Sequence, residues 1–486
     1  MARRQEAAGG ATPAQLWVLA LASLASFMVI LDMLVVATAL TAIRRHLGAS
    51  LADLEWTVNA YTLSFAVLLM TAAALGDRLG RRRVFAAGLA IFATASVACA
   101  LATSTGALIA ARAVQGAGAA AIMPTALALL NGAFPPARRG WAIGMYGSVT
   151  GLAAVLGPVL GGAVTQGLGG QWIFWLNVPI ACGAIPLALA RVAEAKGPAG
   201  ALDLAGLALV TVAALGLTWG LVRGNSVGWT SPETAIALTT GVVAAAGFVG
   251  WERRAAAPML PVRLFRSPAF SAGNGVIFLL NASLTGAVFL MPQFEQVVDA
   301  ASPLTAGLRL LPWGIAPFLL APRALAVTGL LLQAAGLAWI AAVAGPGVGY
   351  PALIAPMAIV GAGFGLAIPA VTRSVTSNVQ PADIGRASGA YSMMRQLGGA
   401  FGVAILGAAF SAAGGNSSPG AFRDGFSVAF GVAAGMTLAA VAAGAILPGR
   451  HSAAASAAAA PASTAAAPAS APEAPASAPA EVSETA

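Results

Sequence analysis

Four ionisable residues stand in or beside long apolar stretches of this 486-residue chain, and their types could do chemistry. Asp32, Arg112 and Arg395 lie inside apolar stretches, and Glu295 follows directly after one. A carboxylate can bind and release a proton, and an arginine can hold a carboxylate in its charged form. If these stretches lie in lipid, each such group costs about 2.5–3.5 kcal/mol at a helix centre. We therefore expect these residues to face a cavity, to form pairs or to line an ion path.

The composition places these residues in a membrane. Of all residues, 59% are hydrophobic and 8% are charged, whereas a soluble domain carries about 25% charged residues. A helix needs about 20 apolar residues to cross the hydrocarbon core, and stretches of that length follow one another along the chain. The net charge of +9 comes from short basic clusters between these stretches. Such clusters indicate membrane topology rather than a nucleic-acid surface.

Apolar stretches bounded by Gly, Pro and charged residues predict fourteen membrane spans. With both termini inside, 18 of the 25 Lys and Arg residues fall in cytoplasmic segments, as the positive-inside rule requires. We expect a cytoplasmic segment at 1–15 and a disordered, Ala- and Pro-rich cytoplasmic tail at 448–486. The predicted spans are 16–40, 54–75, 84–104, 107–131, 141–165, 172–192, 203–222, 235–251, 270–292, 303–321, 325–345, 352–372, 387–413 and 426–447.

Motifs of two other classes of membrane protein are missing from the sequence. An ATP-driven pump needs a phosphate-binding loop of the form GxxxxGK[ST], and the single lysine, Lys196, has no such neighbours. An intramembrane enzyme needs paired acids, a nucleophile with a base, or metal ligands. Cys99, Cys182, His46 and His451 stand far apart, without the spacing of metal ligands. We therefore predict a secondary transporter that is not an enzyme and has no cofactor or metal.

The connection between the second and third spans reads Gly76-Asp77-Arg78-Leu79-Gly80-Arg81-Arg82-Arg83. Two glycines permit a tight turn, the acid can bond basic neighbours, and the arginines keep the loop in the cytoplasm. This spacing closely resembles the signature loop of the major facilitator superfamily. The resemblance implies a cytoplasmic gate loop formed by Gly76, Asp77, Arg78, Gly80, Arg81 and Arg82.

Two further segments resemble elements of the same superfamily. The fourth span carries Arg112-Ala113-Val114-Gln115-Gly116-Ala117-Gly118, similar to an RxxQGxG element that is associated with proton coupling in the antiporters. The fifth span resembles the antiporter motif of the drug-efflux branches, which is linked to export. Its glycines also suit close helix packing and its proline a bend. The residues concerned are Gly147, Gly151, Gly157, Pro158, Gly161 and Gly162.

The first span suggests one branch of the superfamily. Residues 31–40 contain Asp32 and look like the LDxTVVNVALP element of the fourteen-helix drug:proton antiporters, with Leu34, Ala37 and Thr41 in place of its Thr, Asn and Pro. Residues 56–61, 172–179 and 395–399 also resemble that branch.

The connection between the tenth and eleventh spans departs from the family. There the family usually repeats a GxLxDRxGxR loop, but this chain has Ala321-Pro322-Arg323-Ala324-Leu325. We expect a shortened connection near 321–325, with the neighbouring spans shortened or displaced.

The resemblance implies an all-α polytopic membrane protein with the major facilitator fold. Two six-helix bundles, 16–192 and 253–447, would be related by a pseudo-two-fold axis, and 193–252 would hold two inserted linker helices. Substrate would bind near the midplane between the bundles and be exposed alternately to each side.

The implied activity is proton-coupled export of amphipathic hydrophobic or cationic compounds. Asp32 and Arg112 would carry the proton coupling, although a purely structural pair is the alternative for Asp32, and Arg112 could also reach the membrane surface. Candidates for the substrate cavity are Tyr61, Gln115, Glu295 and Arg395, with Met28, Met33, Phe65 and Met70 as apolar lining. Glu295 also fits the rim of the outer face.

Two other functions remain open at this point. One is a proton symporter for a small nutrient, and the other is a transport-inactive membrane scaffold or receptor. We expect a monomer in a bacterial plasma (inner) membrane, with a small amphipathic substrate, protons and lipid as its partners and no nucleic acid.

Overall fold

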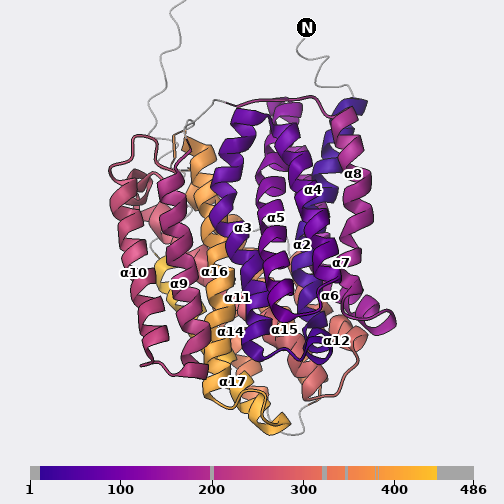
Figure 1. Ribbon diagram of the computed structural model, residues 1–486, viewed down its shortest axis with the longest axis vertical. Coiled ribbons are helices and arrows are strands. Elements are labelled where there is room, and N and C mark those ends of the chain that lie inside the picture. The colour runs from indigo at the N-terminus through magenta and orange to yellow at the C-terminus, as the bar shows by residue number, and fades with distance from the viewer. Residues whose placement is uncertain are drawn as a thin grey trace, which may run out of the picture. The chain divides into compact units, whose positions relative to one another are not determined.

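The protein is described by a computed structural model that places residues 11–197, 202–319, 326–344, 349–377, 379–380 and 383–445. Across these ranges the chain is almost entirely helical and contains no strand. Long helices run up and down side by side, as Figure 1 shows. The all-α membrane fold predicted from the sequence is confirmed.

The first group of helices contains most of the predicted functional residues. A long helix, α2, carries Asp32, and α5 carries Arg112 and Gln115. The bounds are α2 (Pro13–Leu47), α3 (Leu51–Leu79), α4 (Arg81–Ala100), α5 (Thr105–Ala133), α6 (Pro136–Gly167), α7 (Trp172–Trp175) and α8 (Asn177–Arg191).

Two linker helices and a second group follow. The linker helices are α9 (Leu204–Val227) and α10 (Pro232–Glu252). A 3₁₀ helix, η1 (Val262–Arg266), leads into the second group. That group comprises α11 (Pro268–Val297), α12 (Pro303–Arg309), α13 (Leu311–Leu319), α14 (Ala326–Val343), α15 (Pro351–Ser377), α16 (Ile384–Ala412) and α17 (Pro419–Gly444).

The helices begin at residues that can satisfy free backbone N–H groups. Thr12 and Ser50 precede α2 and α3, and each forms a reciprocal capping box with the side chain three residues on. Ser302 and Ser418 cap α12 and α17 by accepting a backbone N–H with the hydroxyl group, each directly before a proline that cannot donate a hydrogen bond. At the other end of α2, Gly48 takes φ +64°, a left-handed conformation that ends the helix.

Thirteen helices of the described ranges are long and apolar enough to cross a membrane. They correspond to thirteen of the fourteen predicted spans. The tenth predicted span, 303–321, is broken into α12 and α13 at Leu310. Pro312 explains the break, because its ring clashes with the carbonyl group four residues earlier and it has no N–H to donate. The shortened connection predicted near 321–325, and the tail predicted at 448–486, lie outside the described residues.

The two groups of helices repeat one packing pattern. In the first group, α3 and α4 pack on α5, α2 packs on α6, and α4 packs on α8. In the second, the helices at corresponding positions pair in the same way: α13 and α14 on α15, α11 on α16, and α14 on α17. This repetition is what a pseudo-two-fold relation between two helix groups produces.

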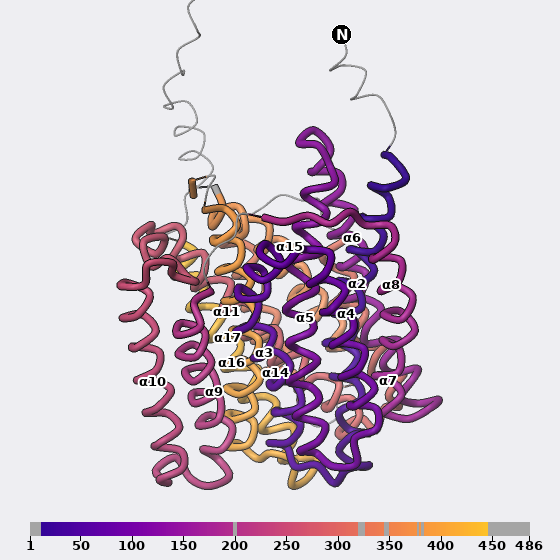
Figure 2. The backbone as a smooth tube through the Cα atoms, turned by 45° about the horizontal axis from the view of Figure 1, so that its top comes forward, coloured from indigo at the N-terminus to yellow at the C-terminus, as the bar shows by residue number. Residues whose placement is uncertain are grey.

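Contacts between the groups run through a few helices. Helix α3 packs on α16 and α6 packs on α12, while α9 and α10 pack on each other and α9 also lies against α3 and α16. Figures 1 and 2 show α9 and α10 together at one edge of the bundle. We call the end that carries the turn at 48–50, together with α12, the outer end, as the charge distribution predicts.

Hydrogen bonds between α2–α8 and α11–α17, among the residues with described positions, all lie at this outer end. Thr41 on α2 donates to the Gln296 side chain at 2.7 Å, and Gln296 donates in turn to the Thr38 carbonyl at 3.0 Å. The Leu304 amide of α12 donates to Gln166 of α6 at 3.3 Å. The outer ends of the two groups are therefore held together.

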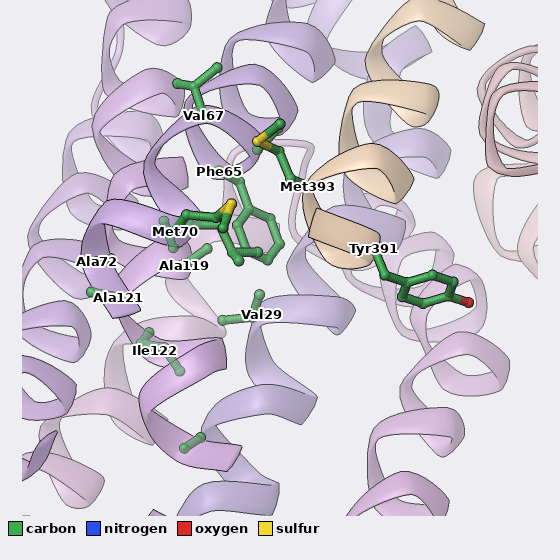
Figure 3. Packing of buried hydrophobic residues seen from close by; sticks show 14 of the residues in the cluster. Val29, Phe65, Val67, Met70, Ala72, Ala119, Ala121, Ile122, Tyr391 and Met393 are labelled. Carbon is green, nitrogen blue, oxygen red and sulfur yellow. The ribbon is translucent and has the colours of Figure 1, made fainter. Parts of the chain in front are cut away.

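A large apolar core extends through both groups. Met28, Phe65 and Met70, predicted as cavity lining, are buried in it. Figure 3 shows Phe65 and Met70 of the first group facing Met393 of α16, across the contact between the groups. These residues thus serve packing in this structure.

Candidate functional site

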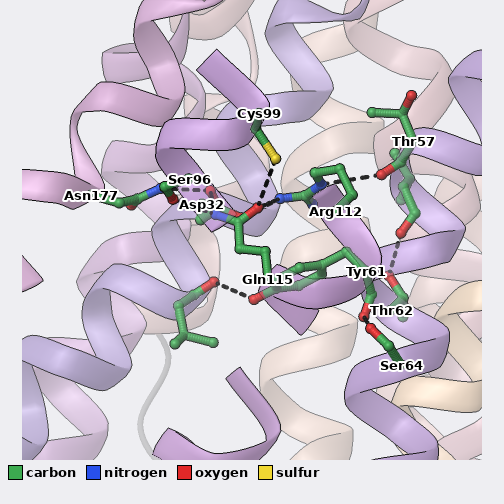
Figure 4. Close-up of polar contacts among 12 residues, drawn as sticks. Asp32, Thr57, Tyr61, Thr62, Ser64, Ser96, Cys99, Arg112, Gln115 and Asn177 are labelled. Atoms are coloured by element: carbon green, nitrogen blue, oxygen red, sulfur yellow. Dashed lines mark hydrogen bonds and ion pairs between the residues drawn. The ribbon is translucent and has the colours of Figure 1, made fainter. Parts of the chain in front are cut away.

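A buried polar network lies in the first group of helices. It brings together Asp32 of α2, Arg112 and Gln115 of α5, and Asn177 at the start of α8. Their exposed fractions are 3%, 1%, 0% and 1%. Figure 4 shows these side chains converging from separate helices. The structure therefore places Asp32 in direct contact with the arginine that the sequence paired with it.

Asp32 accepts three hydrogen bonds from this network. One carboxylate oxygen, Oδ2, accepts from Arg112 Nη1 at 2.5 Å. The other, Oδ1, accepts from Gln115 Nε2 at 2.9 Å and from Asn177 Nδ2 at 2.7 Å. All three partners are donors, so the contacts fit a carboxylate rather than a carboxylic acid. A proton on Asp32 would have no acceptor among these partners, and it would weaken the charge-assisted bond to Arg112.

Arg112 is held on several sides. Its Nη1 also donates to Gln115 Oε1 at 2.6 Å, and its Nε donates to the Thr57 carbonyl of α3 at 3.2 Å. The guanidinium group lies over the ring of Tyr61, 4.2 Å from the ring centroid. Tyr61 donates its hydroxyl to the Val29 carbonyl of α2 at 3.2 Å. Tyr61 and Gln115, predicted for the substrate cavity, thus surround the ion pair.

Three residues of the network were not predicted for the site. Ser96 on α4 accepts from Gln115 at 2.7 Å and from Asn177 at 3.1 Å. Cys99, one turn further on, donates its thiol to Gln115 Oε1 at 3.7 Å. Asn177 lies in the 172–179 stretch whose resemblance to the antiporters was the available signal. An uncharged polar residue in an apolar stretch gives a weaker signal than an acid or an arginine does.

The predicted gate loop is folded against the segment that follows α8. Asp77 of α3 accepts from Arg81 of α4 at 2.7 Å, across the break at Gly80. The Arg81 amide donates to the Ala195 carbonyl at 2.8 Å and the Gly197 amide to the Asp77 carbonyl at 3.1 Å. Arg82 binds the carbonyl groups of Leu189 and Val192. Arg78 is exposed, and Gly76 packs against Thr125 of α5.

Glu194, in the segment after α8, also binds the gate loop, and the sequence did not predict this role. Its carboxylate accepts from the Arg82 amide at 3.0 Å and pairs with the Arg82 and Arg83 side chains at 3.7 and 3.6 Å. Gly80 takes φ +117°, and a Cβ there would lie 2.6 Å from the Glu194 carboxyl carbon. Glycine is therefore required at residue 80 by both its conformation and its neighbour.

The glycines of the predicted antiporter helix, α6, face different neighbours. A Cβ at Gly162 would lie 2.3 Å from the Pro303 carbonyl oxygen of α12, so this glycine permits contact between the two groups. Gly157 and Gly161 face α2, Gly151 faces Phe318 of α13, and a Cβ at Gly147 would meet open space. Pro158 lies inside the helix.

Two candidates lie outside the Asp32 network. Glu295, near the end of α11, is buried and pairs with Arg309, which also binds Asp299 at 3.2 Å. Arg309 lies over the ring of Tyr350, whose pKa is raised by burial and by the nearby Glu295 carboxylate. Arg395 is half-buried on α16 and has no ion pair with another described residue. The structure thus separates these two from Asp32.

A bundle of membrane-length helices in two similarly packed groups, with a charged network buried inside it, defines a polytopic membrane transporter. The model of the Major Facilitator Superfamily matches residues 22–321. The chain belongs to this superfamily and to its drug and antibiotic efflux transporters, which confirms the resemblance seen in the sequence.

Curated relatives carry the names of export or drug-resistance proteins. The chain is 35% identical over 394 residues to the tetracenomycin C resistance and export protein of Streptomyces glaucescens, covering 78% of this chain and 73% of that protein. It is 37% identical over 406 residues to the cephamycin export protein CmcT of Amycolatopsis lactamdurans, covering 80% and 83%. It is 33% identical over 411 residues to the multidrug resistance protein Stp of Mycobacterium tuberculosis, covering 82% and 76%.

A solved structure supports the fold alone. The chain is similar to a crystal structure of the peptide transporter POT in complex with sulfate, with a TM-score of 0.64 and 17% sequence identity. The match covers 89% of this chain and 96% of that one. Fold class and family agree with the sequence prediction, and the chain is a transporter rather than an enzyme.

Proposed function

We propose that the protein exports amphipathic hydrophobic or cationic compounds in exchange for protons, by alternating access. The relatives named for antibiotic export support the direction and the substrate class. The observation that carries the proton coupling is the Asp32 carboxylate, which is buried and bound by Arg112, Gln115 and Asn177. Protonation would weaken these three bonds and would leave the acid proton without an acceptor in this network.

This geometry supplies a coupling mechanism. Protonation of Asp32 would remove the charge that holds Arg112 and would weaken the bonds that the donors on α5 and α8 make to it. A ligand shifts a conformational equilibrium only through its different affinities for the two states. The proton meets that condition, because three donors make the network seen here favour the carboxylate over the acid. Substrate would favour release of the proton by stabilising the state in which Asp32 is charged.

The inter-group contacts suggest which state the structure represents. The hydrogen bonds of Thr41, Gln166 and Gln296 close the outer end, so we infer a state with the outer side closed. In the exchange cycle, opening would break these bonds, and the loop at 76–83 with Glu194 would then help to close the cytoplasmic side.

The proposed organisation follows the charge distribution and the packing. The bundles would comprise 16–192 and 253–447, with 193–252 as the inserted linker pair. The protein would lie in the plasma (inner) membrane of a bacterium with both termini cytoplasmic, and it would act as a monomer.

Dye uptake into inside-out membrane vesicles tests the function. A proton gradient should drive accumulation of ethidium, and Asp32→Asn should abolish the gradient-driven part while the protein remains inserted. Glu252→Gln is the matched control, because it neutralises a buried acid at the end of α10, outside the network. Uptake driven equally well in Asp32→Asn would contradict the proposed role of Asp32. Movement of substrate in the same direction as protons would favour a symporter, and no movement of several unrelated dyes would favour an inactive scaffold.

A further inference from the structure

Glu55 on α3 is a buried carboxyl group that the Asp32 network does not use. Its exposed fraction is 3%, and its Oε2 atom is buried without a hydrogen-bond partner among the described residues. Asn59 lies one turn further on, on the same face of α3. Asn59 is fully buried, and neither atom of its amide has a described partner. Two unpartnered polar side chains therefore lie together within the bundle.

The Glu55 carboxyl lies directly against α16, a helix of the other group. A Cβ at Gly407 would lie 2.2 Å from Glu55 Oε1 and 2.5 Å from its carboxyl carbon. A larger residue at position 407 would therefore displace the acid. Helix α9 lines this contact as well, because Trp219 packs on Trp56 at 5.3 Å and Asn225 donates to the Ala408 carbonyl. The acid is thus enclosed where the outer parts of α3, α9 and α16 meet.

The charged groups on the surrounding helices are bound elsewhere or distant. On α5, Arg112 is bound by Asp32, and on α9, Arg223 is bound by Glu233 of α10. On α16, Arg395 precedes Gly407 by twelve residues, about 18 Å along the helix. None of the remaining titratable groups on α2, α3, α4 and α16 bonds the Glu55 carboxyl: Arg44, Arg45, His46, Asp53, Tyr61, Asp77, Arg78, Arg81, Arg82, Arg83, Cys99, Arg386 and Tyr391.

We propose that Glu55 is a second proton-binding site, distinct from Asp32, which must be protonated before the outer ends of α3 and α16 can close. The inference rests on the alternating-access function proposed above. A carboxylate without a counter-ion is strongly disfavoured in an enclosed site, whereas a neutral carboxyl group is tolerated. When the outer ends separate, Glu55 and Asn59 meet the outer water, and the acid releases its proton to that water. The carboxylate then opposes closure until it takes a proton back.

A distance measurement across the outer end tests this proposal without any substrate. Spin labels are attached at His46→Cys and Ser417→Cys, two exposed positions on different groups. Cys182→Ser removes the exposed native thiol, while Cys99 is buried. Pulsed electron–electron resonance in nanodiscs then gives the closed and open populations between pH 5 and pH 9. The titration is done in the Asp32→Asn background, because Asp32 also exchanges a proton in the proposed cycle. Closure then takes up one proton, at Glu55, and the closed-to-open ratio should fall with rising pH by up to about tenfold per pH unit.

Three variants separate Glu55 from other acids. Glu55→Gln imitates the neutral acid and should stay closed across the whole pH range, whereas Glu55→Asp keeps a carboxyl group and should keep the pH dependence. The matched control Glu252→Gln, which neutralises a buried acid at the end of α10, should also keep it. An unchanged pH dependence in Glu55→Gln, or none in the Asp32→Asn background alone, would overturn the proposal. Since no substrate is present, failure of ethidium transport would leave this result interpretable.

Discussion

Replacement of Arg112 by glutamine is expected to destabilise the protein, because the buried Asp32 carboxylate loses its counter-ion. Arg112 donates to Asp32, Gln115 and the Thr57 carbonyl, and its side chain is 1% exposed. Removing one partner of a buried ion pair costs about 3–5 kcal/mol, because the other charge stays buried without compensation. We therefore expect Arg112→Gln to lower the free energy of unfolding by about that amount.

A double-mutant cycle separates the interaction energy of Asp32 and Arg112 from the effect of each single replacement. Asp32→Asn alone leaves Arg112 unpaired and should also destabilise the protein. The double variant Asp32→Asn/Arg112→Gln contains two neutral amides that can bond each other, so it should be more stable than the sum of the single effects by about 2–3 kcal/mol. The free energies would be measured by denaturant titration in mixed micelles.

Arg395→Gln is the matched control for this cycle. Arg395 also lies in a predicted span, but it has no ion pair with another described residue. Its replacement should change the free energy of unfolding by less than about 1 kcal/mol. Single effects of Asp32→Asn and Arg112→Gln that add to within about 0.5 kcal/mol would refute the reasoning, because residues in direct contact should be coupled.

Three further predictions concern the gate loop and the contact between the two groups. Gly80→Ala should destabilise the protein by about 1–3 kcal/mol in the same titration, because residue 80 has φ +117° and faces Glu194, whereas Gly106→Ala, which faces open space, should not. Gly162→Ala should weaken outer closure by about 1–3 kcal/mol and lengthen the distance between the spin labels, because its Cβ would press on Pro303. Gly147→Ala is the control, because a Cβ there meets open space. Equal effects of the two variants would contradict the role of Gly162 in the contact between α6 and α12. Gln296→Ala removes two hydrogen bonds at the outer end and should favour the open state by about 1–2 kcal/mol; an unchanged distance distribution would count against that closure.

The centre of the site could be predicted because charge is conspicuous in an apolar chain. Asp32 and Arg112 each stand out in a span, and their cost in lipid predicts that they meet. Gln115 lies three residues after Arg112, so it shares the same face of α5. Tyr61 was predicted only as cavity lining, within the stretch 56–61 that resembles the antiporters, and its contact with Arg112 was not foreseen.

The other network residues could not be found in this way. Asn177 and Ser96 are uncharged, so an apolar stretch tolerates them without a partner that the sequence could reveal. Glu194 lies in a connection without any periodic pattern, and its contact with Arg82 depends on how the chain folds back after α8. Tertiary packing alone brings these residues to their partners.

Helix ends and the tenth span differ from the sequence prediction for local reasons. Helix α2 begins at Pro13 and α6 at Pro136, earlier than the apolar stretches at 16–40 and 141–165. Polar caps and prolines extend helices beyond the hydrocarbon core, and hydropathy does not register them. The tenth span was predicted from its apolar content, which gave too little weight to Pro312.

Proton movement during substrate exchange tests the central claim most directly. Purified protein in proteoliposomes would be given an outward ethidium gradient, and a trapped pH indicator would report protons moving the opposite way. The account predicts proton flux with the native chain, and downhill ethidium movement without proton flux in Asp32→Asn. Equal proton flux per ethidium in both proteins would contradict Asp32 as the coupling residue.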